Sequence, residues 1–279
     1  VRARTGATRF GGAKIAPTLG NTHAGTTASQ WCTPHGLLTP ASWIALNATR
    51  YMHQYGVTNE DFGRAVVQLR EYATTNPDAW GYQRPMTLAD HQQSRWIAEP
   101  CIRMFDCCQE TDGAIALVIT SRERAAAMAQ PPVAIAAVAG AALFEQEIAS
   151  DHYRPDLGVM DSSVVVGRRL FDDAGFQRDQ IDLAMIYDAF SPILLMQLEA
   201  LGFCGFGEAN DFVRDGNLAP GGALPCNTNG GLIGEGYIHG LNMVTEAVRQ
   251  IRGTAANQLA RVDVALVSAS RTGAILTRA

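Results

Sequence analysis

The hydrophobic pattern along the chain predicts that strands and helices alternate over its second half. Short apolar runs of the length typical of buried strands alternate there with segments of helical periodicity. The predicted strands cover 114–120, 131–142, 180–190 and 262–270, and the predicted helices cover 162–176, 191–203 and 242–253. Alternation of this kind is typical of an α/β fold with a mainly parallel sheet that helices cover on both faces.

The first hundred residues are more irregular, and helical periodicity is clear in only two segments, 41–56 and 59–76. Asn59 resembles an N-cap because acidic residues follow it, and Asn76 with Pro77 resembles a helix stop. We therefore expect loops and helices in this part of the chain.

Composition narrows the class of protein. The 279 residues are 47% hydrophobic and 18% charged, and no apolar run approaches the ~18 residues that span a membrane. A net charge of -5 with scattered arginines argues against a nucleic-acid partner. We expect a globular cytoplasmic protein of one large domain or two ordinary ones. Because the chain begins at Val1, we also expect that residues are missing upstream.

The cysteines and histidines do not form a metal-binding or disulfide pattern. Six cysteines have no CxxC pair, and the histidines have neither HxH nor HExxH spacing. We expect reduced thiols, no metal site, and a packing role for the adjacent Cys107 and Cys108.

Candidate chemistry lies where predicted strands end. Tyr187 directly follows a buried strand, so its hydroxyl could reach a crevice; the alternative is a buried tyrosine bonded to backbone. The glycine-rich stretch 227–240, NTNGGLIGEGYIHG, allows positive φ angles and close approach to a ligand; the alternative is a structural turn. Tyr237 and His239 would face one side if this stretch is extended, whereas a helical start would separate them.

The order of several segments resembles the thiolase superfamily, in its sterol-carrier-protein-like branch of proteins often labelled lipid-transfer proteins. The resemblance covers nearly the whole chain, and the late motifs are its most specific part. It rests on TGATRFGG, NEDFGRAVVQLREYATTNPDAWGYQRPMTLAD, IAEPCIRMFDCCQETDGAIALVI, IYDAF, LEALGFCGFGE and GGALPCNTNGGLIGEGYIHG.

The resemblance implies a thiolase-like layered α/β/α/β/α fold with mainly parallel sheets, of which the amino-terminal half is not in this sequence. Residues 1–112 would be the loop region and the end of the amino-terminal half, 113–150 the last strands of that half, and 151–279 the carboxy-terminal half.

Departures from the family pattern imply different chemistry. Tyr237 occupies the position of the histidine in the family's GHP motif, and the late cysteine region contains Ser268 and Ser270. This pattern is similar to that of thiolase-like aldolases of bacterial steroid side-chain degradation. A retro-aldol step needs a base and an enolate-stabilising donor, but no covalent acyl-enzyme.

The resemblance thus implies a retro-aldolase that cleaves a 17-hydroxy steroid side-chain CoA thioester to a 17-keto steroid and propionyl-CoA. Tyr187 and Tyr237 would be catalytic, flanking the bond that breaks, with the acid and base roles open. His239, Gly234, Gly236 and Asn229 would contact substrate. We expect no cofactor, since CoA is part of the substrate, and a heterotetramer in which a dimer of this protein binds DUF35 partners that carry a zinc ribbon and an OB-fold.

Three alternatives stay open from the sequence. A thiolase-like acyltransferase would need a nucleophilic cysteine in the absent half. A carrier would bind acyl-CoA or lipid without turnover. A scaffold subunit would use the glycine-rich stretch only to dock its neighbour.

Overall fold

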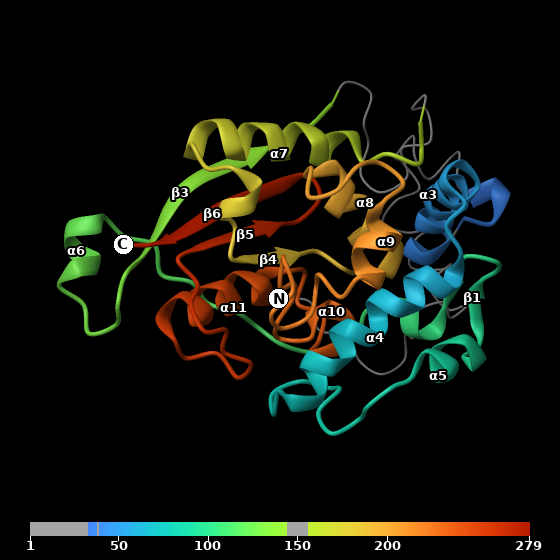
Figure 1. Cartoon of the computed structure of the whole chain (residues 1–279), viewed down its shortest axis with the longest axis horizontal. Coiled ribbons are helices and arrows are strands. Elements are labelled where there is room, and N and C mark those ends of the chain that lie inside the picture. Colours follow the sequence, from blue (N-terminus) through green and yellow to red (C-terminus); the bar gives the residue numbers. More distant parts are fainter. Residues whose placement is uncertain (1–32, 38, 144–155) are drawn as a thin grey trace.

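A computed structural model describes residues 33–37, 39–143 and 156–279 (Figure 1). The TGATRFGG segment and Cys32 lie outside these ranges. The helices are α3 (Pro40–Tyr55), α4 (Asn59–Thr75), α5 (Leu88–Gln93), α6 (Arg122–Ala126), α7 (Asp161–Ala174), α8 (Ser191–Ala200), α9 (Ala209–Arg214), α10 (Gly231–Gly234) and α11 (Leu241–Arg252), with short 3-10 turns at Thr33–His35, Met104–Asp106 (η3) and Arg178–Gln180. The strands are β1 (Trp96–Ala98), β2 (Ile102–Arg103), β3 (Val133–Gly140), β4 (Leu183–Ile186), β5 (Val264–Ser268) and β6 (Thr272–Arg278).

The main sheet has the strand order β3-β6-β5-β4. Strands β4 and β5 are parallel, whereas β6 runs antiparallel to both β5 and β3. The α/β prediction is confirmed, but this sheet is mixed rather than mainly parallel. The reason is the unpredicted strand β6, which follows β5 through the tight turn 269–271 and not through a helical crossover, so it must run in the opposite direction.

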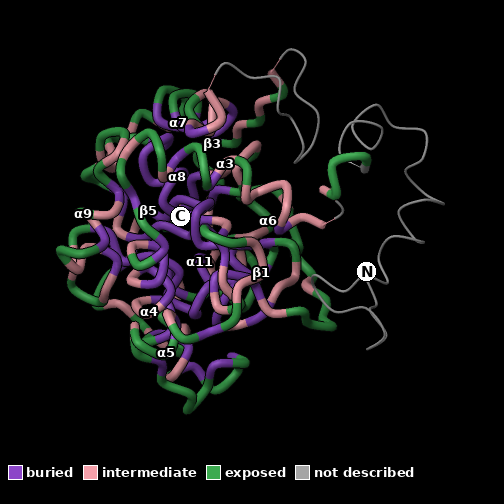
Figure 2. Tube along the Cα trace, turned by 90° about the vertical axis from the view of Figure 1, so that its right-hand side faces the viewer, coloured by how far each residue is buried: buried purple, intermediate pink, exposed green. Residues whose placement is uncertain are grey.

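Helices α7 and α11 cover opposite faces of the sheet (Figure 1). Helix α7 approaches β6 closely, since a Cβ added to Gly273 would lie 2.8 Å from the Leu170 side chain. The buried chain segments gather around β5, α8 and α11 (Figure 2), and β4 is buried along its whole length. The end of β4 is therefore held rigidly in the interior, which suits it to position a side chain.

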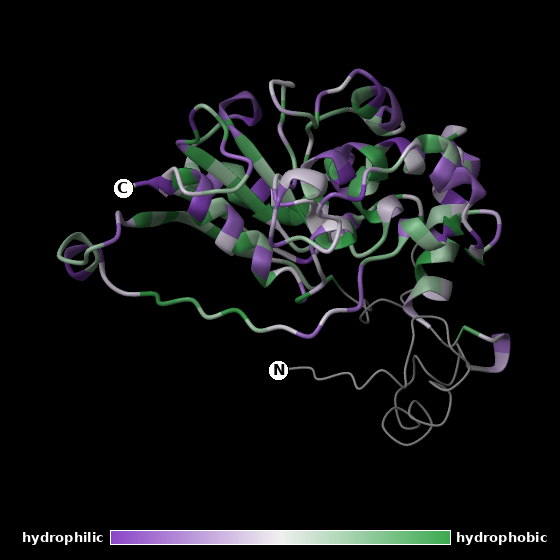
Figure 3. Cartoon of the chain, turned by 90° about the horizontal axis from the view of Figure 1, so that it is seen from below, coloured by the Kyte–Doolittle hydropathy of each residue, from purple (hydrophilic) through white to green (hydrophobic). Residues whose placement is uncertain are grey.

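The prediction of a buried strand at 114–120 is wrong. This apolar segment has no regular structure and runs along the outside of the molecule (Figure 3), with Val118 85% and Ile119 76% exposed. Strand β3 does form as predicted, but it lies at the sheet edge with Val138 66% exposed. An apolar run is buried only where neighbouring strands cover it, and within the described residues none does so here.

The two predicted helices of the first half are confirmed as α3 and α4. The N-cap of α4 is Thr58 rather than Asn59; the Thr58 amide donates to the Asp61 carboxylate over 2.8 Å. Asn59 is the first helical residue and is buried, where its side chain has a structural role. No helix within the described ranges has the length and apolar character needed to cross a bilayer.

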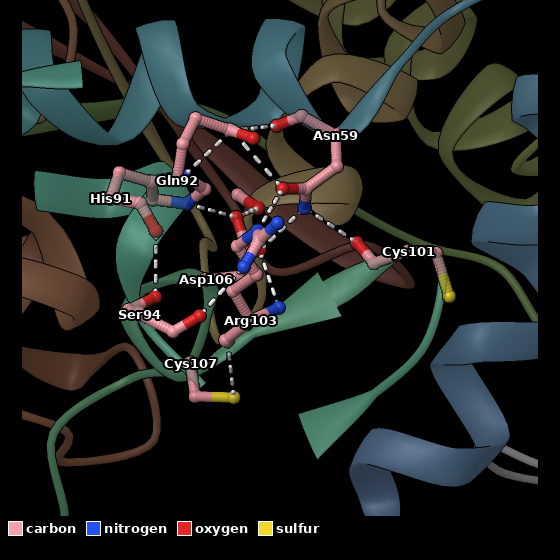
Figure 4. A network of polar contacts seen from close by, with 9 residues as sticks. Asn59, His91, Gln92, Ser94, Cys101, Arg103, Asp106 and Cys107 are labelled. Atoms are coloured by element: carbon pink, nitrogen blue, oxygen red, sulfur yellow. Dashed lines mark hydrogen bonds and ion pairs between the residues drawn. The ribbon is translucent and has the colours of Figure 1, made fainter. Parts of the chain in front are cut away.

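A buried polar network around Asp106 joins α4 to the start of α8 (Figure 4). The Asp106 carboxylate accepts hydrogen bonds from Asn59 Nδ2, His91 Nε2 and the Arg103 amide, at 2.9, 2.9 and 2.7 Å, and from the Ser191 hydroxyl. Because one carboxylate binds donors from four segments, it fixes the position of α8 relative to the rest of the chain.

Candidate active site

Tyr187 is the first residue after β4, and its backbone is bonded on both sides. Its amide donates to the Ser268 carbonyl at 2.9 Å, and its carbonyl accepts from Gln197 Nε2 at 2.7 Å. Gln197 is buried on α8, and its Oε1 accepts from both the Ser268 hydroxyl and the Ser270 amide at 3.0 Å. One amide side chain thus fixes the end of β4 relative to the turn after β5.

The glycine-rich segment 227–240 starts beside β4. Asn227 has a φ of 52° and takes the place of a strand partner for Ile186: its Oδ1 accepts from the Ile186 amide at 2.7 Å and its Nδ2 donates to the Ile186 carbonyl at 2.8 Å. This contact holds the glycine-rich segment at the carboxyl end of the strand that carries Tyr187.

The side chain of Asp188 lies against the first turn of helix α10. Its fully buried carboxylate accepts from the Leu232 amide at 2.8 Å and from the Ile233 amide at 3.4 Å. Burial raises the pKa of Asp188 to about 7, although these two amides act in the opposite direction. Gly231 lies so close that an added Cβ would be 2.1 Å from the carboxylate. Asp188 is thus a hydrogen-bonding residue at the start of α10, and two amides of the glycine-rich segment donate to it.

Tyr187, Tyr237 and His239 form one hydrogen-bonded chain. The two phenolic oxygens lie 2.8 Å apart, and the Tyr237 oxygen lies 2.9 Å from His239 Nδ1. The tyrosine rings meet edge to face with centroids 6.2 Å apart, and the Tyr237 and His239 centroids are 4.7 Å apart. Tyr237 and His239 therefore face the same side, although the segment is not extended: His239 lies in a turn and has a left-handed φ of 51°.

Exposure increases along this chain of side chains. Tyr187 and Tyr237 are half-buried and His239 is exposed. Burial, followed by the charge that Tyr237 would carry, raises the pKa of Tyr187 far above its ordinary value. Tyr187 consequently remains protonated and acts as a hydrogen-bond donor at neutral pH, whereas His239 gives the chain an end that solvent can reach.

The backbone around Tyr237 is also held by the segment before the exposed apolar stretch. The Tyr237 amide donates to the Gln109 carbonyl at 3.2 Å and to Thr111 Oγ1 at 3.3 Å. The Gln109 amide in turn donates to the Leu232 carbonyl, and the neighbouring Cys108 amide donates to the Ala189 carbonyl. Residues 108–111 therefore connect the Tyr187 side of the site to the Tyr237 side.

Three other residues that sequence analysis assigns to substrate binding have contacts within the protein. Gly234 packs on α4, where an added Cβ would lie 2.7 Å from Ala73 Cβ, and its carbonyl accepts from the Gly81 amide. Asn229 is buried and donates to Glu235, while the Gly236 carbonyl accepts from Asn242. These contacts shape the loop below Tyr237, and contact of these residues with substrate stays a prediction.

No pattern in the sequence points to Gln197 or Glu235. Gln197 lies on a helix that is buried along its whole length, so no polar face marks it. Glu235 lies beneath the Tyr237 loop and accepts from Asn229 Nδ2 and Asn242 Nδ2, at 2.5 and 2.6 Å; burial raises its pKa. The partners of Gln197 on β5 and its turn are distant in sequence and are close only after folding, whereas those of Glu235 lie six and seven residues away within the glycine-rich loop and the start of α11.

The cysteines have packing positions. Cys107 and Cys108 are buried, as predicted, and no disulfide joins any of the described cysteines. Burial raises the pKa values of four of them, which is the opposite of an activated nucleophile; these are Cys101, Cys107, Cys204 and Cys226. Within the described ranges, no group of three His, Cys, Asp or Glu side chains is arranged to hold a metal ion.

Comparisons with known proteins identify the family of the chain. Residues 145–279 match the family described as "Thiolase C-terminal domain-like". The chain is 50% identical over 246 residues to a "Steroid side-chain-cleaving aldolase" of Thermomonospora curvata, covering 88% of this chain and 63% of that relative. It is also 50% identical over 236 residues to the "17-hydroxy-3-oxo-4-pregnene-20-carboxyl-CoA lyase" of Mycobacterium tuberculosis, covering 85% of this chain and 61% of that relative.

A solved structure is similar over a still larger share of the chain. The "Ltp2-ChsH2(DUF35) aldolase" superposes with a TM-score of 0.89 at 48% identity, covering 92% of this chain and 68% of the solved one. The chain spans less than two thirds of the length of each of the two curated relatives named above.

Proposed function

Because this chain belongs to the thiolase superfamily, we propose that it works as a carbon–carbon lyase: a retro-aldolase that cleaves a 17-hydroxy steroid side-chain CoA thioester to a 17-keto steroid and propionyl-CoA. The observation that carries the proposal is the hydrogen-bonded chain of Tyr187, Tyr237 and His239 at the end of β4. The names of two curated relatives that are 50% identical to the chain support the substrate class.

The geometry favours Tyr237 as the group that receives the proton of the substrate hydroxyl. His239 Nδ1, in its unprotonated form, accepts from the Tyr237 hydroxyl, so that the phenolic oxygen can take up the hydroxyl proton as its own proton moves to the imidazole. As the carbonyl forms, the carbon–carbon bond breaks and its electron pair passes into the thioester enolate.

Tyr187 is better suited to donate a proton. A phenol with a strongly raised pKa remains protonated and can stabilise the enolate by hydrogen bonding, and then transfer its proton to the enolate carbon. The Tyr237 hydroxyl, 2.8 Å away, returns a proton to Tyr187, and the proton held by His239 restores Tyr237. Each side chain thus regains its proton at the end of the cycle, and no covalent intermediate is needed. Since the two hydroxyls touch, the substrate would lie across the pair rather than between the rings.

The environment of Ser268, one of the two serines in the late cysteine region, does not favour acyl transfer by the described residues. Ser268 is buried, and its hydroxyl donates to Gln197. Its hydrogen bond serves to fix the β5 turn and leaves Ser268 unsuited to attack a thioester. The raised pKa values of the buried cysteines point the same way.

The assembly is part of the same proposal. The partner would be a DUF35 protein with a zinc ribbon and an OB-fold, and two copies of this protein would dimerise within a cytoplasmic heterotetramer. The named composition of the similar solved structure supports the DUF35 partner.

The test mixes the purified protein and its DUF35 partner with a 17-hydroxy steroid side-chain CoA thioester. Mass spectrometry should detect propionyl-CoA and the 17-keto steroid in equal amounts. Binding of the thioester without any product would favour the carrier, and exchange of the acyl group onto added free CoA would favour the acyltransferase.

A further inference from the structure

Arg70, on helix α4, is a buried cation whose hydrogen-bonding capacity is largely unused. The residue is 4% exposed, and its guanidinium makes one long hydrogen bond, from Nη1 to the Arg84 carbonyl at 3.4 Å. Its Nε and Nη2 atoms are buried and have no hydrogen-bond partner among the described residues. A buried charged donor without an acceptor is costly, so an acceptor is expected at this place.

The surroundings of Arg70 add a second positive charge. The Arg70 guanidinium lies 5.1 Å from the ring centre of Trp80 and 6.0 Å from that of Phe105, and the Arg84 guanidinium lies 4.9 Å from the same Trp80 ring. Burial and the charge of Arg84 lower the pKa of Arg70. No ion pair to a carboxylate within the described part of the chain offsets either arginine.

The residues beside the Arg70 guanidinium lie at the surface. Arg84 is exposed, and Trp80 is 43% exposed and lies in the irregular segment between α4 and α5. Both guanidinium groups contact the Trp80 ring, so Trp80 is the exposed side chain whose shift would uncover the Arg70 guanidinium. The Nε and Nη2 edge of Arg70 presents two parallel N–H donors, the arrangement that binds two oxygens of one oxyanion.

We propose that Arg70, Arg84 and Trp80 form a binding site for a phosphate group, with Trp80 moving aside to admit it. A phosphate fits better than a carboxylate because its charge matches two guanidinium groups and its several oxygens can accept from both. Arg70 supplies a bidentate contact from below, and Arg84 closes over the group from the solvent side.

The site is joined directly to the catalytic loop. The Trp80 amide donates to the Glu235 carbonyl at 2.9 Å, and the Gly81 amide donates to the Gly234 carbonyl at 2.9 Å. Glu235 precedes Tyr237 by two residues. A phosphate that orders the Trp80 segment would therefore also order the backbone that carries Tyr237.

Two sources could supply the group: free inorganic phosphate, or the phosphorylated adenosine of a CoA thioester, the second of which rests on the proposed function. The test titrates the full chain with inorganic phosphate, and separately with adenosine 3′,5′-bisphosphate, at constant ionic strength, and follows tryptophan fluorescence. A Trp80→Phe variant identifies the signal of Trp80.

We expect a saturable fluorescence change that Trp80→Phe lacks. Arg84→Met should weaken phosphate binding by about tenfold or more, because a charge-assisted contact is lost. Arg84 is exposed, so this variant should fold even if Arg70→Met does not. The matched control is Arg64→Met. Arg64 lies on α4, as Arg70 does, but it already forms ion pairs with Glu60 and Asp61.

Equal phosphate affinity of the Arg84→Met and Arg64→Met variants would overturn the proposal, as would a crystal structure grown in phosphate that shows only a water molecule at Arg70 Nε and Nη2. Tighter binding of the adenosine bisphosphate than of phosphate would identify the thioester as the source, and equal or weaker binding would identify free phosphate. A failure to form propionyl-CoA would leave the phosphate result unchanged, so the two proposals fail separately.

Discussion

The hydroxyl groups of Tyr187 and Tyr237 touch at 2.8 Å although 50 positions of sequence separate them. Their contact depends on two buried side chains that join β4 to the glycine-rich segment: Asn227, bonded to both backbone groups of Ile186, and Asp188, bonded to the start of α10. The predictions below test how these supports and the phenols themselves contribute.

Replacement of Gln197 by methionine should lower both stability and activity. The substitution keeps the length of the side chain but leaves the Tyr187 carbonyl and the Ser270 amide without their partner, at a cost of roughly 1–3 kcal/mol for each buried group. Chemical denaturation and turnover would be measured together, with the exposed Gln177→Met as the control. Unchanged turnover in Gln197→Met would show that the hydrogen bonds of Gln197 do not position Tyr187.

Alanine at Gly231 should destabilise the protein far more than alanine at Gly216. Both glycines have positive φ angles, 68° and 79°, so both variants bear the backbone strain of about 1–2 kcal/mol. Only at Gly231 would the new methyl group strike the Asp188 carboxylate; the space around Gly216 is open. Thermal unfolding of the two variants isolates the contact with Asp188, and equal losses of stability would contradict it.

Asp188 should make the free energy of unfolding depend on pH. Burial raises its pKa to about 7 in the folded protein, against about 4 for an unfolded chain. The folded state therefore binds the proton more tightly, so this contribution to stability is fully present below about pH 4 and is lost as the pH rises toward 7.

The Asp188→Asn variant should lack this dependence. Denaturant titrations of both proteins at several pH values between 4.5 and 7.5 would measure it. The difference in unfolding free energy should change by about 3 kcal/mol between these two pH values, because each pKa unit corresponds to roughly 1.4 kcal/mol and the titration is incomplete at both limits. Parallel curves for the two proteins would mean that Asp188 remains ionised.

Replacement of His239 by alanine should slow turnover by about 10²-fold or more while leaving the fold intact, because an exposed side chain that assists proton transfer is removed. Steady-state kinetics would separate kcat from KM, and the loss should fall on kcat. The exposed His53→Ala provides the control. A change confined to KM would assign His239 to substrate binding alone.

The local pattern of hydrophobic and polar residues predicts those helices and strands that form mainly through interactions between residues close in sequence. The helices α4 and α11 have clear helical periodicity, β4 is a short apolar run buried along its whole length, and the place of Tyr187 at the end of that run marks it as a candidate. The side-by-side positions of Tyr237 and His239 have a different origin: His239 lies in a turn with a φ of 51°, so the two-residue period of extended chain does not explain them.

Other features depend on partners distant in sequence. The run containing Val118 has the composition of a buried strand, but composition does not supply the neighbour that would bury it. The turn after Ser268 reverses the chain into β6, which the alternation of strands and helices did not indicate. Gln197 forms hydrogen bonds with Tyr187, Ser268 and Ser270, which are 10, 71 and 73 positions away in the sequence. Its role therefore exists only once β4, β5 and α8 are assembled.

The most direct test of the account is the cleavage rate of Tyr187→Phe, Tyr237→Phe and the double variant, each assayed with the DUF35 partner and a 17-hydroxy steroid CoA thioester, with the exposed Tyr82→Phe as the control. Phenylalanine keeps the rings and removes only the hydroxyls. We predict that each single variant loses about 10²-fold to 10⁴-fold in kcat, and that the double variant loses little more than the worse single one, because the two hydroxyls act as one unit. Full activity in both single variants would contradict the central claim that this pair of phenols carries the protons.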